Sequence, residues 1–325
     1  MSARDSIFVE ASARLHFGVL DLRGSLGRRF GGLGAAVPQP SLLLEVSPAA
    51  RISAEGEDGE RAAEFAGRLL AYHGLPGGAH LRVHRAIPAH SGLGSGTQLG
   101  LSVARALAEL HGLPSEPGEL ARAVSRGERS AIGTWTFAHG GFIVEGGRRV
   151  GSEEIAPLLE RLPVPANWRC VVAVPRGDPG LSGEAESAAF RRLPPPPEPE
   201  VERVAHLVLM QLLPALVEDD LAGFGAALTT VQRITGAWFA PEQGGIFAPG
   251  PTSALVAKMS EWGAAGVGQS SWGPAVYGLV ATETAGRTLA ARVQNLLGSD
   301  GRVFEGGFAN SGARLWREEP AAVPD

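Results

Sequence analysis

The sequence has little of several residues on which common kinds of protein chemistry depend. Only one of its 325 residues is cysteine, Cys170, so internal disulfides and cysteine-based zinc or iron–sulfur sites are excluded. Because Cys170 lies in an apolar, strand-like stretch, we expect a buried and unreactive side chain. Lys258 is the only lysine. Lysine-based Schiff-base or general-base catalysis therefore has a single candidate, and we expect it at the surface.

Long apolar runs and a strong excess of charge are also missing. No apolar run approaches the ~20 residues that span a bilayer, and residues 1–10 contain charges but no apolar signal-peptide stretch. The net charge of −5 and the 19% of charged residues do not form the basic footprint of a nucleic-acid-binding protein. We expect a cytoplasmic protein that acts on small molecules, with no nucleic-acid or membrane partner. Its length is enough for two domains.

A glycine- and serine-rich loop at residues 88–98 is the most informative feature that is present. It follows a strand-like stretch at 81–87 and precedes a helical run at 99–111. Such a turn directs backbone N–H groups and a helix N-terminus at one point, which attracts phosphate. The alternative is a plain turn, but the flanking strand and helix favour phosphate binding. It is not a Walker loop, because no G-K-[ST] follows.

Two other stretches narrow the family. The first begins Ala13-Arg14-Leu15-His16-Phe17-Gly18 and continues to residue 34. The second contains Gly266-Val267-Gly268-Gln269-Ser270-Ser271-Trp272-Gly273-Pro274. Together with the loop, which has the pattern P-x-x-x-G-L-G-S, they resemble the beta-ribofuranosylaminobenzene 5'-phosphate synthases of the GHMP kinase superfamily. The resemblance spans roughly residues 8–312.

The resemblance implies a two-domain α+β fold of the GHMP-kinase type, with domains at residues 1–165 and 166–325. It also implies a homodimer that acts as a decarboxylating C-riboside synthase in tetrahydromethanopterin biosynthesis. Phosphoribosyl pyrophosphate (PRPP) would be joined to 4-aminobenzoate or 4-hydroxybenzoate, with release of carbon dioxide and pyrophosphate. Because the ribosyl centre ionises as pyrophosphate leaves, Mg²⁺ and backbone N–H groups on the leaving group would stabilise the transition state.

Hydrophobic periodicity and turn residues predict the elements. Strands are expected at 7–10, 41–47, 140–144, 167–174 and 302–308, and a strand and turn at 267–280. Helices are expected at 60–73, 99–111, 119–129, 201–218, 219–235, 252–264 and 284–297. The segment 176–200 ends in four prolines at 194–197, which cannot be helix interior. It is either a surface loop or a lid over the substrate.

In GHMP kinases, the first serine of the loop and a glutamate on the next long helix bind magnesium. By spacing they correspond to Ser95 and Glu128, and a carboxylate is a suitable hard ligand for this ion. The alternative for Glu128 is an exposed partner of Arg122 or Arg129.

The kinases also carry a catalytic aspartate ten or eleven residues after that glutamate. This chain has Ala138 and His139 there, and no aspartate occurs between Asp58 and Asp178. The difference argues against an ATP-dependent small-molecule kinase, the main alternative. A non-catalytic sensor of phosphate ligands is the third hypothesis.

The candidate site residues fall into three groups. Those for catalysis are Arg14, His16 and His139, since arginine can grip a phosphate or carboxylate and histidine can donate a proton, although a lone histidine is often structural. Those for phosphate binding are Gly92, Leu93, Gly94, Ser95, Gly96, Thr97 and Gln98, together with Arg28, Gln269, Ser270 and Ser271, of which the last three are expected to support the loop. Aromatic side chains that either stack on an acceptor ring or belong to the core are Trp135, Phe137 and Trp272.

Overall fold

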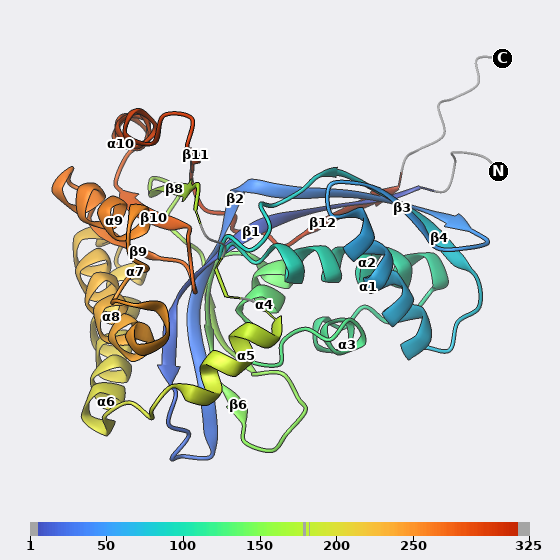
Figure 1. Cartoon of the computed structure of the whole chain (residues 1–325), viewed down its shortest axis with the longest axis horizontal. Helices are drawn as coiled ribbons and strands as arrows, with labels where there is room; N and C mark the ends of the chain where they lie inside the picture. The colour runs from blue at the N-terminus through green and yellow to red at the C-terminus, as the bar shows by residue number, and fades with distance from the viewer. Residues whose placement is uncertain (1–5, 178–179, 182, 318–325) are drawn as a thin grey trace.

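Two β-sheets organise the computed structural model, which describes residues 6–177, 180–181 and 183–317 (Figure 1). The larger sheet has eight strands, with the order β12-β1-β2-β4-β3 and with β5, β6 and β7 attached beside β2. Its strands are β1 (Ile7–Asp21), β2 (Arg28–Ala49), β3 (Ser53–Gly56), β4 (Gly78–Arg85), β5 (Phe142–Glu145), β6 (Arg148–Arg149), β7 (Leu158–Leu162) and β12 (Arg314–Arg317).

The first two strands form a hairpin much longer than the sequence pattern predicts. They pair from Ile7↔Val46 to Asp21↔Phe30, with register shifts after Ser12 and His16. The glycine-rich residues 31–34, which were not expected to be strand, lie inside β2. At Gly34 a Cβ would come within 2.4 Å of Ile132 Cγ2. Glycine therefore serves here to bring a helix close to the sheet rather than to make a turn.

Four helices cover one face of this sheet (Figure 1): α1 (Gly59–Tyr72), α2 (Ser95–His111), α3 (Pro117–Ala123) and α4 (Ile132–His139). Helix α2 starts at Ser95, directly after the left-handed Gly94, so the glycine loop feeds straight into its N-terminus. The predicted helix at 119–129 ends early, because Ser125 (φ 55°) and Gly127 (φ 82°) adopt left-handed backbone angles. Glu128 is therefore on a loop between α3 and α4, not on a helix.

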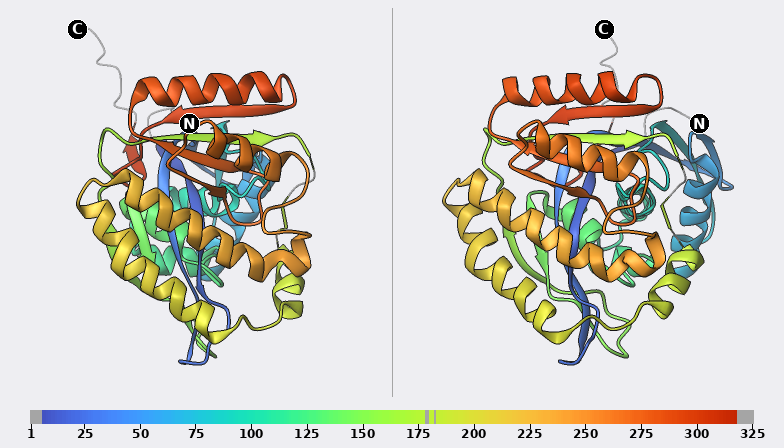
Figure 2. Two further views of the ribbon diagram at one scale, coloured as in Figure 1. Left: turned by 90° about the vertical axis from the view of Figure 1, so that its left-hand side faces the viewer. Right: turned by 60° about the vertical axis from the view of Figure 1, so that its left-hand side comes forward.

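The smaller sheet has the order β11-β8-β10-β9 and consists of β8 (Arg169–Pro175), β9 (Gly266–Gln269), β10 (Val276–Val280) and β11 (Gly301–Gly306). Val171 and Ala173 of β8 pack with residues of α9 (Pro251–Glu261) and α10 (Glu283–Leu297). Figure 2 shows these two helices beside the strands of the smaller sheet. The alternate residues Cys170 and Val172 belong to the main core, to which α8 (Leu221–Gln243) also contributes. Cys170 is buried, as predicted, and burial raises the pKa of its thiol.

The segment after β8, the first strand of the smaller sheet, contains α5 (Gly183–Arg192), which the sequence analysis did not predict, and the proline run follows it. Then come α6 (Glu198–Leu207), a π-helical turn η2 (Val208–Leu212) and α7 (Leu213–Val217), which together replace the single helix expected at 201–218. The boundary predicted at residue 165 separates the two sheets except for β12, which returns to pair with β1. Among the described residues, no helix is long and apolar enough to cross a membrane.

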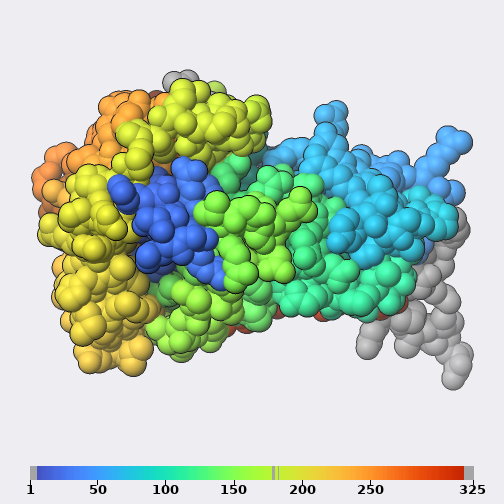
Figure 3. Space-filling view, turned by 90° about the horizontal axis from the view of Figure 1, so that it is seen from below, coloured from blue at the N-terminus to red at the C-terminus, as the bar shows by residue number. Residues whose placement is uncertain are grey.

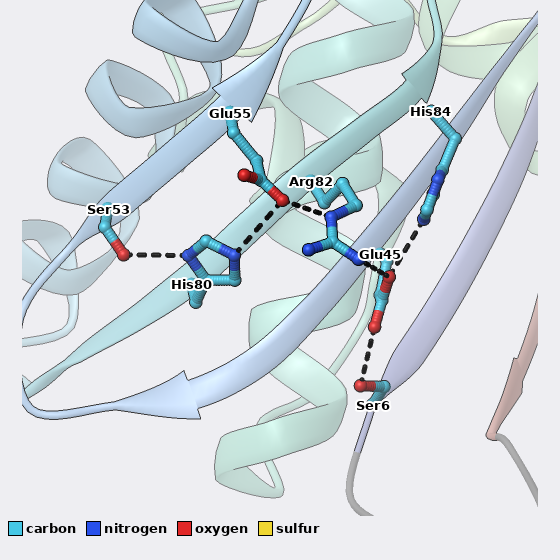
Figure 4. A network of polar contacts seen from close by, with 7 residues as sticks. All are labelled: Ser6, Glu45, Ser53, Glu55, His80, Arg82 and His84. Carbon is cyan, nitrogen blue, oxygen red and sulfur yellow. Dashed lines mark hydrogen bonds and ion pairs between the residues drawn. The ribbon is translucent and has the colours of Figure 1, made fainter. Parts of the chain in front are cut away.

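A polar network lies on β2, β3 and β4 (Figure 4). Glu45 accepts hydrogen bonds from Ser6 Oγ (2.9 Å) and His84 Nε2 (2.9 Å), and Arg82 joins it to Glu55. Partial burial of Glu45 raises the pKa of its carboxyl, but the hydrogen bonds from His84 and Ser6 outweigh burial, so the pKa is lowered overall. Exposed ion pairs contribute little stability individually, and we assign this network a structural role.

Candidate active site

One cavity of about 430 Å³ lies where the two halves of the chain meet. Its wall includes residues of β1, of the α2 N-terminus, of the loop before α4, of α5, of α8 and of the turn after β9. The segment 176–200 thus reaches the cavity through α5. On the face seen in Figure 3, the tip of the β1–β2 hairpin lies between the segment with α5 and the segment around residue 150.

The glycine loop is held in place by two of the other sequence motifs. Arg14 donates from its backbone N to Leu93 O (3.1 Å) and from Nη1 to Gly92 O (2.5 Å). Ser270 Oγ donates to the same Gly92 oxygen (2.7 Å). Of the loop residues, Thr97 lines the cavity, at the positive end of the α2 dipole. The three motifs identified in the sequence therefore meet at one point.

Arginine side chains surround the start of α2. At Gly96, a Cβ would come within 2.6 Å of Arg61 Nη2 and 3.2 Å of Arg126 Nη2. Arg126 stacks over Phe65, with its guanidinium carbon 4.9 Å from the ring centroid. Burial lowers the pKa of Arg126 to about 10, with Arg61 a second cause, and also lowers that of Arg14 to about 10. Both remain cationic at neutral pH.

The cluster of Arg61, Arg68, Arg126 and Arg129 was missed in the sequence analysis, although Arg68, Arg126 and Arg129 line the cavity together with Arg14. Arg129 forms an ion pair with Glu186 of α5 (2.5 Å) and donates to Ser187 Oγ (2.8 Å). The only sequence signal was that Arg126 and Arg129 flank the candidate ligand Glu128. Crowded cations around a helix N-terminus, with backbone N–H groups beside them, are suited to a polyanionic ligand such as a pyrophosphate.

Another part of the cavity wall is aromatic, and it adjoins the arginines where Arg129 lies over the Phe190 ring. Trp272 and Phe239 meet edge to face with centroids 4.8 Å apart, and Phe190 of α5 packs against Trp272 (5.6 Å) and Phe30 (5.4 Å). All four side chains line the cavity. The other two aromatic candidates lie elsewhere: Trp135 Nε1 donates to Ala156 O (2.9 Å), and Phe137 belongs to the core.

The two histidine candidates are placed very differently. His16 lines the cavity and is 8% exposed, and burial, followed by the charge of Arg14, lowers its pKa to about 3. His16 is therefore a neutral imidazole at physiological pH. His139 ends α4 and stacks on Trp135, outside the cavity lining. The structure gives no support to its predicted catalytic role.

Arg28 is also outside the cavity lining. It is exposed at the start of β2 and donates to Gly147 O (3.0 Å). The third motif, in contrast, is built into the wall: Gln269 and Ser271 line the cavity, and the Gln269 amide group bonds Ala248 N (2.8 Å) and Gln243 Oε1 (3.1 Å).

The two residues predicted for magnesium are placed differently. Glu128 is exposed and lines the cavity, while Ser95, at the start of α2, is 9% exposed and is not among the residues that line it. The described parts of the chain contain no cluster of three or more His, Cys, Asp or Glu that could hold a metal. Since Mg²⁺ is commonly held by one or two carboxylates plus substrate phosphates, Glu128 is suited to a phosphate-bound ion and not to a resident one.

Comparison with known proteins first defines the class. Residues 60–141 match the GHMP kinases N terminal domain and residues 212–298 the GHMP kinases C terminal domain. Homoserine kinase from Cytophaga hutchinsonii has the same fold (TM-score 0.66, 20% identity, 97% of this chain and 99% of that chain covered). So does galactokinase from Lactococcus lactis (TM-score 0.66, 13% identity, 96% of each chain covered). These likenesses show the predicted two-domain α+β fold.

Sequence relatives then define the family. Beta-ribofuranosylphenol 5'-phosphate synthase of Methanothermobacter thermautotrophicus is 35% identical over 94% of this chain and 98% of its own length. The Archaeoglobus fulgidus protein of the same name is 34% identical over 84% of this chain and 88% of its own length. The chain belongs to this family of enzymes, as the sequence motifs predicted.

Proposed function

We propose that the protein joins the ribosyl 5-phosphate group of PRPP to 4-hydroxybenzoate, with loss of carbon dioxide and pyrophosphate. The observation that carries this proposal is one cavity with arginines on part of its wall, here called the arginine-rich end, and aromatic rings on another part, here called the aromatic end. The two parts meet where the Arg129 guanidinium carbon lies 5.9 Å from the Phe190 ring centroid. A ligand with several phosphate charges suits the first end and a flat aromatic ring suits the second. The resemblance of the family implies a place in tetrahydromethanopterin biosynthesis.

At the arginine-rich end, the α2 N-terminus, Arg14 and Arg126 would hold the pyrophosphate. These groups are already fixed by the contacts with Gly92 and Phe65, so they need little reorganisation as negative charge develops on the leaving group. When bound, Mg²⁺ would neutralise further charge on the pyrophosphate oxygens, and Glu128 and Ser95 are the residues that we propose would hold it.

At the aromatic end, Trp272, Phe239 and Phe190 would hold the acceptor ring so that its carboxyl-bearing carbon faces the ribosyl centre. The ring carbon forms a bond to the anomeric carbon while the bond to pyrophosphate breaks. The electron pair of the carboxyl C–C bond then returns to the ring as carbon dioxide leaves, which restores aromaticity. No strong base is needed for this second step, and the aromatic wall keeps water from the ribosyl cation.

The relatives' names support 4-hydroxybenzoate over 4-aminobenzoate, because the product that they name is a phenol. The proposal also includes the cytoplasmic location and the homodimer implied by the resemblance. Analytical ultracentrifugation would test the dimer.

The alternative, an ATP-dependent small-molecule kinase, has the support of the fold alone. The experiment that separates the two proposals incubates the protein with Mg²⁺ and either PRPP plus 4-hydroxybenzoate or ATP plus homoserine. Pyrophosphate release that requires both PRPP and the benzoate, with no ADP from ATP, is the expected result. ADP formation without pyrophosphate release would favour the kinase.

A further inference from the structure

Glu145 is a buried carboxyl behind the cavity wall for which the proposed reaction has no role. It ends β5, is 0% exposed and pairs in register with Gly32 of β2. Residues directly opposite in an antiparallel pair project from the same face of a sheet. Because Gly32 has no side chain, the Glu145 carboxyl can extend over this position.

The imidazole of His16 reaches the same position from the other edge of β2, since β1 and β5 flank β2 here. A Cβ built on Gly32 would lie 3.3 Å from Glu145 Oε1 and 3.3 Å from His16 Nε2. The carboxyl and the imidazole therefore share the space left open by the glycine. Any larger residue at position 32 would stand between them.

The carboxyl needs a partner. Neither of its oxygens accepts a hydrogen bond of good geometry from the part of the chain that the structure describes. An unpaired buried carboxylate costs several kcal/mol, so the group either stays protonated or finds a donor. We propose that Glu145 is a positioning residue for His16: its carboxyl O–H donates to His16 Nε2 across Gly32 and fixes the tautomer and the orientation of the ring.

The electrostatics of the pair agree with this assignment. Burial raises the pKa of Glu145 to about 7, although the Ser130 hydroxyl and the Ala131 N–H lower it in part. Burial and Arg14, the charged group that faces His16 from β1, lower the pKa of His16 to about 3. Below pH 7 the shared proton therefore belongs on the carboxyl, and the pair is uncharged.

The consequence concerns what His16 can do in the cavity. A neutral imidazole has one N–H and one acceptor nitrogen, so a ring that accepts at Nε2 carries its hydrogen on Nδ1. The role that this inference gives to His16 rests on the proposed function. In that reaction, His16 would donate a hydrogen bond to the benzoate substrate from a fixed orientation and would not act as a general base.

The direct test is ¹⁵N NMR of the ligand-free protein labelled at histidine, with the His16 signals assigned by their loss in His16→Asn. We expect the Nδ1–H tautomer in the wild type. Glu145→Leu should release His16 to the Nε2–H tautomer, and Gly32→Ala should do the same by placing a methyl group between the two side chains. Glu145→Gln, whose amide can still donate, should retain the wild-type tautomer. Glu160→Leu, on the neighbouring strand β7 with an exposed side chain, is the matched control.

Kinetics give a second readout. In Glu145→Leu, kcat/KM for the benzoate should fall roughly 10-fold, the effect of one lost hydrogen bond, with KM for PRPP unchanged and recovery in Glu145→Gln. Unchanged His16 signals in Glu145→Leu would overturn the inference even if the enzyme makes its product. The expected signals in a protein without synthase activity would leave the pairing intact and overturn the proposed function instead.

Discussion

Ser270 donates a hydrogen bond to the carbonyl oxygen of Gly92 at 2.7 Å, across 178 residues of sequence. The same hydroxyl oxygen accepts from the backbone N–H of His16 at 3.0 Å. One side chain from the C-terminal half therefore connects the glycine loop to β1. Because Arg14 also donates to the Gly92 oxygen and Trp272 follows Ser270 closely in the chain, this contact joins the two parts of the cavity wall.

Loss of Arg126 should weaken PRPP binding. In Arg126→Gln we expect KM for PRPP to rise at least ~10-fold, since a charge-assisted contact to phosphate is worth more than a neutral one, while KM for the benzoate changes little. Steady-state kinetics with each substrate varied measure this. Arg287→Gln, at an exposed position of α10, is the control. An equal rise for both substrates would place Arg126 outside the phosphate site.

The aromatic end should show the reverse pattern. Trp272→Leu removes the edge-to-face contacts with Phe239 and Phe190. We expect KM for the benzoate to rise roughly 10-fold, because the variant loses both an aromatic ring contact and buried apolar area against the substrate ring. KM for PRPP should stay near the wild-type value. Trp316→Leu, in which the lost ring stacks on Phe8 far from the cavity, should change neither constant.

Magnesium should bind only together with PRPP. Titration calorimetry with Mg²⁺ alone should give no binding heat, because the described residues contain no group of three or more His, Cys, Asp or Glu side chains that could hold a metal ion. In the presence of PRPP, Glu128→Gln should raise the Mg²⁺ concentration needed for half-maximal activity by about 10-fold. Stoichiometric Mg²⁺ binding to the ligand-free protein would contradict this account.

Glu145 should make stability depend on pH in the direction opposite to acid denaturation. Its pKa is about 7 in the folded protein and 4.5 ordinarily, so the folded state keeps a proton that the unfolded state has lost. The stability that the folded state gains by keeping this proton is fully present below pH 4.5 and is lost as the pH rises towards 7.

Replacement by Gln removes that dependence. The free energy of unfolding of Glu145→Gln minus that of wild type should increase by on the order of 1–3 kcal/mol when the pH is raised from about 4.5 to about 8. Urea denaturation at both pH values measures this. Glu160→Gln serves as the control. A difference between variant and wild type that is the same at both pH values would mean that Glu145 titrates normally.

The sequence predicted the parts of the site that depend on local backbone geometry. The glycine loop, the start of β1 and the turn after β9 carry recognisable glycine and serine patterns, and the structure brings Arg14, Thr97 and Ser270 together from them. The convergence of Arg61 and Arg126 at Gly96 could not be predicted, because it depends on how α1 packs against α2 and how the loop after α3 folds back.

The main misplacements in the sequence analysis have physical reasons. Glu128 was expected on a helix, but the left-handed Ser125 and Gly127 end α3 before that glutamate. The apolar helix α4 lacked an amphipathic pattern and was missed. The strand β2 was truncated because its glycines predict turns, whereas the structure uses Gly32 and Gly34 for close approach of side chains and of a helix.

The most direct test of the central claim is the fate of the benzoate carboxyl carbon. With PRPP, Mg²⁺ and 4-hydroxybenzoate labelled with ¹³C at the carboxyl group, labelled carbon dioxide and pyrophosphate should form in a 1:1 ratio, which the reaction scheme requires because each C–C bond formed releases one of each. The organic product should be a phenol without the label. Pyrophosphate release with the carboxyl group retained in the product would contradict decarboxylating C-riboside synthesis.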